Sequence, residues 1–238
     1  MRKILFVCFV FCNFYSSVTS PDHQSENNIN AEKIKKAKNK KNIPFAGFSI
    51  HLPEQSFAAD FCKWLTSDYA IQFNATSTMT EESIAPVLPA IANRMSSQKK
   101  PYMYMWFVKK NDKLVGEFAV DEIDYYFKKA ILRYVVNDDM YGKKIGTKIM
   151  YLMLIQAFDV LHLHKVYATV VVGNEASMKI FKKFGFREVG LLREEYIINN
   201  GQRVDMIYFE ILRSDFEKLR KKYNDFLGKN EIQANNRV

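Results

Sequence analysis

AILRYVVNDDMYGKKIGT, the stretch from Ala130 to Thr147, decides the fold of this 238-residue chain. Its first part is mostly apolar and predicts a strand that ends at Val135 and Val136. The loop YGKKIG then leads into residues 144–161, where apolar residues recur at helical spacing. Residues 165–172 (KVYATVVV) form a nearly continuous apolar run, which is typical of a buried strand. A strand, a loop, a helix and a second strand in this order predict a βαβ crossover.

The flanking segments complete a mixed sheet. From the amino end, the expected elements are a helix at 58–65, a helix at 81–95 interrupted near Pro86 and Pro89, hairpin strands at 102–108 and 113–123 around KKND, a helix at 174–186 closed by Gly185, and a last strand at 204–212. The helix after the loop is expected to be amphipathic, with an apolar face of Ile145, Ile149, Leu152, Met153 and Leu161. These elements predict an α/β fold, a mixed and mostly antiparallel central sheet with helices on both faces.

Three sequence patterns, in order over some eighty residues, resemble those of the GNAT superfamily of N-acetyltransferases. The family pattern A-E-I-G-Y-V-V, four residues, then W-G-K-G-x-G-T corresponds to residues 130–147. The pattern N-E-x-A/S-x-x-x-Y-x-K-x-G-F corresponds to NEASMKIFKKFGF, and a glycine turn followed by V-D corresponds to NNGQRVDMIYFEIL. The branch that acetylates ribosomal-protein N-termini, polyamines and amino sugars is the most similar. Residues 45–129 match only in rough architecture.

The loop Tyr141–Gly146 precedes a helix whose first amide N–H groups lack partners and carry a partial positive charge, so it suits a pyrophosphate. The resemblance implies that this pyrophosphate belongs to acetyl-CoA. Lys144 stands where relatives often have glycine. Because it opens a helix, it is expected to take ordinary helical backbone angles and to add an ammonium beside the phosphate.

The resemblance also implies a splayed pair of strands at Val135 and Val136, whose backbone groups hold the acetyl and pantetheine parts. Asn174 would meet the pantetheine arm and also cap a helix. The cofactor-binding residues implied in this way are Val135, Val136, Tyr141, Gly142, Lys143, Lys144, Ile145, Gly146, Thr147, Asn174, Ser177 and Phe181.

The catalytic groups are less well defined, because three positions depart from the family pattern. Phe181 stands where many relatives have a tyrosine that protonates the leaving thiolate, and a phenyl ring has no proton to give. Ile131 and Thr169 occupy positions where relatives place a glutamate. The catalytic candidates are Asn174, Tyr208 and Glu117. Tyr196, Asp205 and water stay open as alternatives, as does departure of the thiolate without protonation.

The activity implied by the resemblance is transfer of an acetyl group from acetyl-CoA to a primary amine, by direct attack in a ternary complex. The acceptor would be a protein N-terminal α-amine, an amino sugar or a polyamine. A site without an obvious base favours an α-amine over a lysine, because a larger fraction of an α-amine is neutral. The acceptor groove is expected from residues 50–100 and the loop near residues 199–203. The alternative is a catalytically weak or inactive CoA-binding module.

Charge and histidine spacing limit other functions. The net charge is +9, but residues 1–44 hold eight basic residues against three acidic ones, so +5 of the charge lies there. The remaining excess is small and no RNA-binding motif is present, so direct nucleic-acid binding is not expected. His162 and His164 have no Cys, Asp or Glu at ligand spacing, so no metal site is expected.

The expected domain organisation has four parts. Residues 1–20 resemble a secretory signal with a short apolar run. Residues 21–44 are a Lys- and Asn-rich, transit-like segment that is expected to be disordered. Residues 45–222 are expected to form the N-acetyltransferase domain, and residues 223–238 a polar tail. The leader predicts entry into the secretory pathway, with a plastid-type organelle as one destination and a membrane-anchored or secreted protein as the alternative. No stable membrane span is expected after processing, and the sequence leaves the oligomeric state open.

Overall fold

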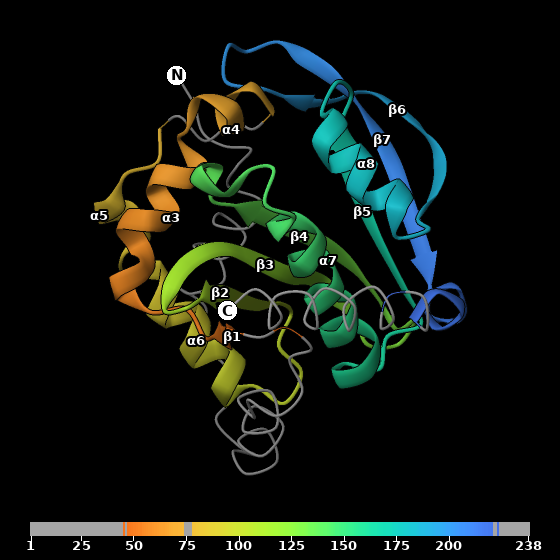
Figure 1. Cartoon of the computed structure of the whole chain (residues 1–238), viewed down its shortest axis with the longest axis horizontal. Coiled ribbons are helices and arrows are strands. Elements are labelled where there is room, and N and C mark those ends of the chain that lie inside the picture. The colour runs from red at the N-terminus through yellow and green to blue at the C-terminus, as the bar shows by residue number, and fades with distance from the viewer. Residues whose placement is uncertain (1–44, 46, 74–77, 221–222, 224–238) are drawn as a thin grey trace, which may run out of the picture.

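A seven-stranded sheet organises the molecule in the computed structural model, which describes residue 45, residues 47–73, 78–220 and residue 223. The strand order is β1-β2-β3-β4-β5-β7-β6 (Figure 1). The strands are β1 (Phe48–His51), β2 (Tyr104–Lys110), β3 (Lys113–Asp124), β4 (Lys129–Val136), β5 (Lys165–Val171), β6 (Arg187–Ile197) and β7 (Arg203–Leu212). All neighbouring pairs are antiparallel except β4 and β5, which are parallel. The expected mixed sheet and the crossover between β4 and β5 are therefore confirmed.

Helices cover both faces of this sheet. They are η2 (Gln55–Phe57), α3 (Ala58–Leu65), α4 (Asp68–Phe73), α5 (Glu81–Ile84), α6 (Val87–Ser97), η3 (Asp138–Met140), α7 (Ile145–Ile155), the π-helix η4 (Gln156–Val160), α8 (Glu175–Lys183) and a helix at 213–220. Phe107 of β2 packs against Phe61 of α3, with ring centroids 5.2 Å apart. A Cβ on Gly116 of β3 would lie 2.5 Å from Ile149 of α7. Since Phe107 pairs with the residue after Gly116, α3 and α7 lie on opposite faces.

The helix predicted at 81–95 is interrupted between α5 and α6, as expected near Pro86 and Pro89. α5 ends at Ile84 and α6 begins at Val87, directly after Pro86. Pro89 lies in the first turn of α6, where its missing N–H removes no helical hydrogen bond. The predicted interruption is therefore confirmed, and it lies at Pro86, while Pro89 is accommodated inside α6. None of the helices in the described ranges combines the length and the apolarity needed to cross a bilayer.

α7 is buried on all sides from Ile149 to Leu154, so the prediction of an amphipathic helix is wrong. Its residues from Ile149 to Leu154 are all at most 3% exposed, and Leu161 lies beyond the helix. The helix at 213–220 covers the outer side: the ring of Phe216 lies 5.9 Å from that of Tyr151 and 5.4 Å from that of Phe158. The polar face that a surface helix needs is therefore not required here.

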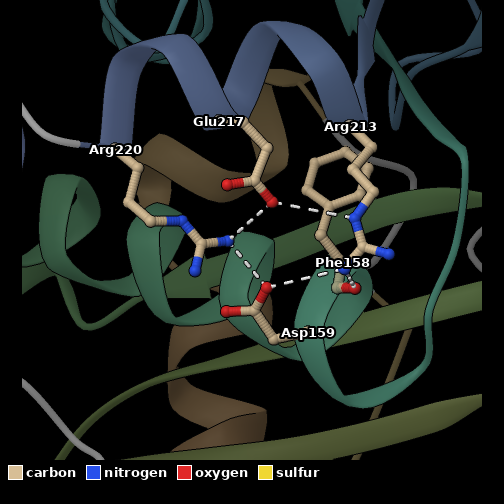
Figure 2. Close-up of polar contacts among 5 residues, drawn as sticks. All are labelled: Phe158, Asp159, Arg213, Glu217 and Arg220. Carbon is tan, nitrogen blue, oxygen red and sulfur yellow. Dashed lines mark hydrogen bonds and ion pairs between the residues drawn. The ribbon is translucent and has the colours of Figure 1, made fainter.

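A group of charged side chains fixes this covering helix to the end of α7 (Figure 2). Asp159 of η4 accepts from Arg220 at 2.7 Å and lies 3.8 Å from Arg213. Glu217 joins the same two arginines at 3.3 and 3.7 Å, and Arg213 also donates to the carbonyl of Phe158. These side chains are 30% to 48% exposed, so each pair contributes about 1 kcal/mol or less.

Two strands were not predicted from the sequence, and one was predicted to be too deeply buried. β1 has only four residues. β6 is an edge strand, exposed along most of its length and irregular in register, so it lacks a clear alternation of apolar residues. In β5, Tyr167 is half-buried and Thr169 exposed, although the apolar run predicted burial on both faces.

Candidate functional site

The parallel strands β4 and β5 separate before either of them ends. They pair only between Lys129–Ile131 and Lys165–Tyr167. Beyond Ile131, β4 continues to Val136 along β3, and β5 continues to Val171 along β7. Within the described residues, the facing edges of the two strands therefore carry backbone N–H and C=O groups without ladder partners.

A cavity of about 480 Å³ lies at this opening. Its walls come from the end of β4, the loop before α7, the first turns of α7 and α8, and the segment of α3 and α4 that includes Tyr69. The predicted cofactor residues that line it are Val135, Val136, Tyr141, Gly142, Lys144, Ile145, Gly146, Thr147, Asn174 and Ser177. The structure thus brings together residues from three distant parts of the sequence.

Two predicted cofactor residues lie outside the cavity lining. Lys143 donates from Nζ to the carbonyl of Asp139 at 2.9 Å and is exposed. Phe181 is 3% exposed and belongs to the core, where its ring stacks on Phe209 with centroids 5.5 Å apart and meets Phe186 edge-on at 4.8 Å. An apolar phenyl group is best stabilised by this burial.

Lys144 does not have the helical backbone angles that were expected. It is the N-cap of α7 with φ 61° and ψ 18°, which is the left-handed region. Gly142, two residues earlier, has φ 75°. The chain must reverse between η3 and α7 within a few residues, and left-handed angles provide that reversal. This geometry explains why glycine suits the position, since a side chain costs free energy there.

A second lysine near the loop was missed. Burial lowers the pKa of Lys183, and the neighbouring Lys144 ammonium lowers it further. Lys183 belongs to α8, whose Ile180 would lie 2.8 Å from a Cβ on Gly146. The two ammonium groups and the amino end of α7 together favour an anion. A signal for Lys183 was present, because it is the lysine of the pattern N-E-x-A/S-x-x-x-Y-x-K-x-G-F, but the packing of α8 on α7 joins distant segments and was not predicted.

Asn174 caps α8, as predicted, and its side-chain oxygen accepts hydrogen bonds from two donors. Its Oδ1 accepts from the N–H of Ser177 at 3.1 Å and from the hydroxyl of Tyr69 at 3.0 Å. Nearby, the hydroxyl of Tyr134 donates to Ser177 Oγ at 3.3 Å, and burial raises the pKa of Tyr134 to about 12. Tyr69 and Tyr134 both line the cavity but were not selected as site residues from the sequence.

Two catalytic candidates, Glu117 and Tyr208, are outside the cavity lining. Glu117 of β3 pairs with Val135 of β4 and is 4% exposed. Burial raises its pKa well above the usual value, the negative charge of Asp121 adds to this, and Arg133 opposes it. Tyr208 of β7 pairs with Thr169. Its ring stacks on Tyr167 with centroids 5.4 Å apart, and burial raises its pKa.

Among the other candidates, Asp205 accepts from the backbone N–H of Glu194 at 2.8 Å, which stabilises an irregular stretch of β6. The loop expected to border the acceptor groove contacts α4, because Asn199 Nδ2 donates to the carbonyl of Ile71 at 3.1 Å. No group of three or more His, Cys, Asp or Glu side chains within the described ranges is arranged to hold a metal ion.

Residues 50–208 match a family model described as an acetyltransferase (GNAT) domain. The putative ribosomal N-acetyltransferase YdaF of Bacillus subtilis is 30% identical over 104 residues, which is 44% of this chain and 56% of that protein. A spermidine N(1)-acetyltransferase of Vibrio cholerae is 31% identical over 103 residues, covering 43% of this chain and 59% of that protein. The matched segment thus spans less than two thirds of both relatives.

Solved structures share the fold at lower identity. A ribosomal-protein-S5-alanine acetyltransferase from Vibrio fischeri superposes with a TM-score of 0.64 at 19% identity, over 72% of this chain and 96% of that one. A spermidine N-acetyltransferase from Vibrio cholerae, in complex with CoA and spermine, superposes with a TM-score of 0.63 at 20% identity, over 72% of this chain and 98% of that one.

Proposed function

Because the chain belongs to the GNAT acetyltransferase family, we propose that it transfers an acetyl group from acetyl-CoA to a primary amine. The observation that carries this proposal is the opening between β4 and β5, whose unpaired backbone edges border a cavity at the amino end of α7. An extended ligand can bind such an edge as an added strand does. The amino end of the adjacent helix supplies the anion site that a pyrophosphate requires.

In this proposal each part of the cavity holds one part of the cofactor. The loop Tyr141–Gly146, with Lys144 and Lys183, binds the pyrophosphate. The edge of β4 at Val135 and Val136 holds the pantetheine arm and the acetyl end, and Asn174 offers its amide from the opposite side. The bound cofactor supplies an activated acetyl thioester. The chain contributes by aligning that thioester with the amine and by donating backbone hydrogen bonds to its carbonyl.

Proton transfer is assigned to Glu117. An amine must lose a proton to attack and to form an amide, so the site needs a proton acceptor. Burial raises the pKa of the Glu117 carboxyl well above its usual value, and Glu117 pairs with Val135, where the acetyl end is proposed to lie; Glu117 itself is buried behind the cavity lining. Phe181 supplies no proton and lies in the core. With a thiol pKa of about 8.5, the CoA thiolate is a competent leaving group without a donor.

The proposed acceptor is a protein N-terminal α-amine or a polyamine. The similar proteins are named as a ribosomal-protein-S5-alanine acetyltransferase and a spermidine N(1)-acetyltransferase, and a protein N-terminus and spermidine both contain primary amines. The contact between Asn199 and α4 places the turn between β6 and β7 beside the helices of residues 50–100, where the acceptor groove is expected. Lysine side chains are poorer acceptors, because a far smaller fraction of them is neutral at pH 7.

The test is turnover of acetyl-CoA by the full chain, measured as free thiol released with a panel of acceptors. The panel contains peptides with a free α-amine, the same peptides with a blocked α-amine and one lysine, spermidine and an amino sugar. Thiol release with a free α-amine or spermidine supports the proposal. Binding of acetyl-CoA without release on any acceptor would instead establish a CoA-binding module, the alternative that the departures from the family pattern at Lys144, Phe181, Ile131 and Thr169 motivate.

We also propose import into an acetyl-CoA-containing organelle, because secretion would separate such an enzyme from its cofactor. The leader that motivates this idea lies outside the described residues. Imaging of the tagged full chain beside a version lacking residues 1–44 tests it, and a purely extracellular signal would exclude it.

A further inference from the structure

Tyr69 connects three parts of the candidate site. It lies on α4, and its hydroxyl donates to Oδ1 of Asn174, the residue that caps α8. Its ring meets the ring of Tyr141 edge-on, with centroids 4.9 Å apart, so it also touches the loop before α7. All three residues line the cavity. A tyrosine from a helix outside the three sequence patterns therefore contacts both cofactor-binding segments.

The hydrogen bonds at Asn174 fix the orientation of its amide group. The N–H of Ser177 can only donate, so the atom that faces it at 3.1 Å must be the side-chain oxygen. The Tyr69 hydroxyl occupies the second acceptor site of the same oxygen at 3.0 Å. The NH₂ group is consequently turned away from both donors, and no residue in the described part of the chain accepts a hydrogen bond from it.

We propose that Tyr69 is a positioning residue that holds the Asn174 amide with its NH₂ group available to a carbonyl of the pantetheine arm. This inference rests on the proposed function, since it requires that the cavity binds CoA. The pantetheine arm contains two amide carbonyls, and an NH₂ group in the cavity wall without a protein partner is the complementary donor. Without the Tyr69 hydroxyl, Asn174 would keep its cap to Ser177 but lose the second restraint on its side chain.

α4 is suited to this role because it is held at two points. Tyr69 packs between Tyr141 and Phe73, whose ring centroid lies 5.4 Å away. Two residues further on, the carbonyl of Ile71 accepts from Asn199 in the turn between β6 and β7. In Figure 1, α4 lies near the tip of that hairpin, across the upper end of the sheet. Contacts with Tyr141 and Asn199 therefore fix the position of α4, and with it the position of the Tyr69 hydroxyl.

The alternative is that Tyr69 only fills space in the cavity wall. The two roles predict different results with CoA and with adenosine 3′,5′-bisphosphate, which keeps the nucleotide of CoA but lacks pantetheine. Tyr69→Phe removes the hydroxyl and retains the ring contact with Tyr141. If Tyr69 positions Asn174, the variant weakens CoA binding by about fivefold and leaves bisphosphate binding unchanged. A change in the loop would weaken both ligands equally.

The experiment is calorimetric titration of the full chain with each ligand, for the wild type, Tyr69→Phe, Asn174→Asp and the double variant. Asn174→Asp keeps the oxygens that accept from Ser177 and Tyr69 but removes the NH₂ donor, so it preserves the cap of α8. It is expected to weaken CoA as Tyr69→Phe does. In the Asn174→Asp background, Tyr69→Phe should have no further effect on CoA binding.

The outcomes separate this inference from the function on which it rests. A wild type that binds neither ligand refutes the proposed function, and the role of Tyr69 with it. A wild type that binds CoA beside a Tyr69→Phe variant of equal affinity refutes only the role of Tyr69. Additive losses in the double variant, or an equal loss for both ligands, also overturn it, because each would show that Tyr69 does not act through Asn174.

Discussion

Replacement of Lys144 by glycine and by alanine separates a backbone effect from a charge effect at the loop. Lys144 has φ 61° and ψ 18°, so any L-residue with a Cβ is strained there, whereas glycine is not. We expect Lys144→Gly to raise the free energy of unfolding by about 1 kcal/mol relative to Lys144→Ala. For a domain of this size, that difference corresponds to a melting temperature about 2–4 °C higher. Thermal unfolding of the two variants measures it directly.

Both variants remove the same ammonium group, so both should weaken CoA binding to the same extent. The loss is expected to be about fivefold at low salt and smaller at high salt, because exposed charges are screened. Lys144→Arg is the matched control, since it keeps both the charge and the strain. Equal unfolding free energies for the glycine and alanine variants would refute the backbone argument. Undiminished CoA affinity at low salt would refute the charge argument.

Three further predictions concern a buried acid, the charged group in Figure 2 and a close backbone contact. Burial raises the pKa of Glu117, so its stabilising contribution is greatest at low pH and is lost as the pH rises through the folded-state pKa. Glu117→Gln should therefore make the free energy of unfolding less dependent on pH above 4.5. Denaturant titrations that give the same dependence of unfolding free energy on pH for the variant and the wild type would contradict this. Asp159→Ala removes the acceptor that two arginines share and should lower the free energy of unfolding by about 1–2 kcal/mol. An unchanged melting temperature would instead show that aromatic contacts alone hold the helix at 213–220. Gly116→Ala would place a Cβ 2.6 Å from the carbonyl of Val135, so it should lower the free energy of unfolding by about 1–3 kcal/mol and weaken CoA binding. Gly190→Ala is the control, because a Cβ there meets nothing within 4 Å. Equal unfolding free energies and equal CoA affinities for the two variants would contradict this prediction.

The parts of the site that were predicted depend on local spacing. The loop Tyr141–Gly146 lies between β4 and α7 as expected, and Asn174 caps α8, because both features follow from a few consecutive residues. The opening between β4 and β5 was expected only through the family resemblance, since a Val-Val pair by itself is typical of any buried strand. The binding and catalytic roles of these residues stay predictions.

The parts that were missed depend on packing between distant segments. Tyr69 reaches Asn174 across 105 residues of sequence, and Lys183 reaches the loop because α8 packs on Gly146. The left-handed angles of Lys144 are set by the reversal of the chain and not by the preference of a lysine. β6 was missed because an exposed, irregular edge strand lacks the alternation that identifies a strand.

The short pairing between β4 and β5 has a mechanical consequence. Three residue pairs are the whole ladder between the half-sheet β1–β4 and the half-sheet β5–β7–β6. The loop before α7 belongs to the first half, whereas Asn174 and Ser177 belong to the second. A ligand that contacts both half-sheets adds interactions where the sheet has the fewest hydrogen bonds. Its binding free energy therefore also stabilises the association of the two half-sheets. Amide hydrogen exchange should then slow in both half-sheets when CoA binds, including in strands that never touch the ligand.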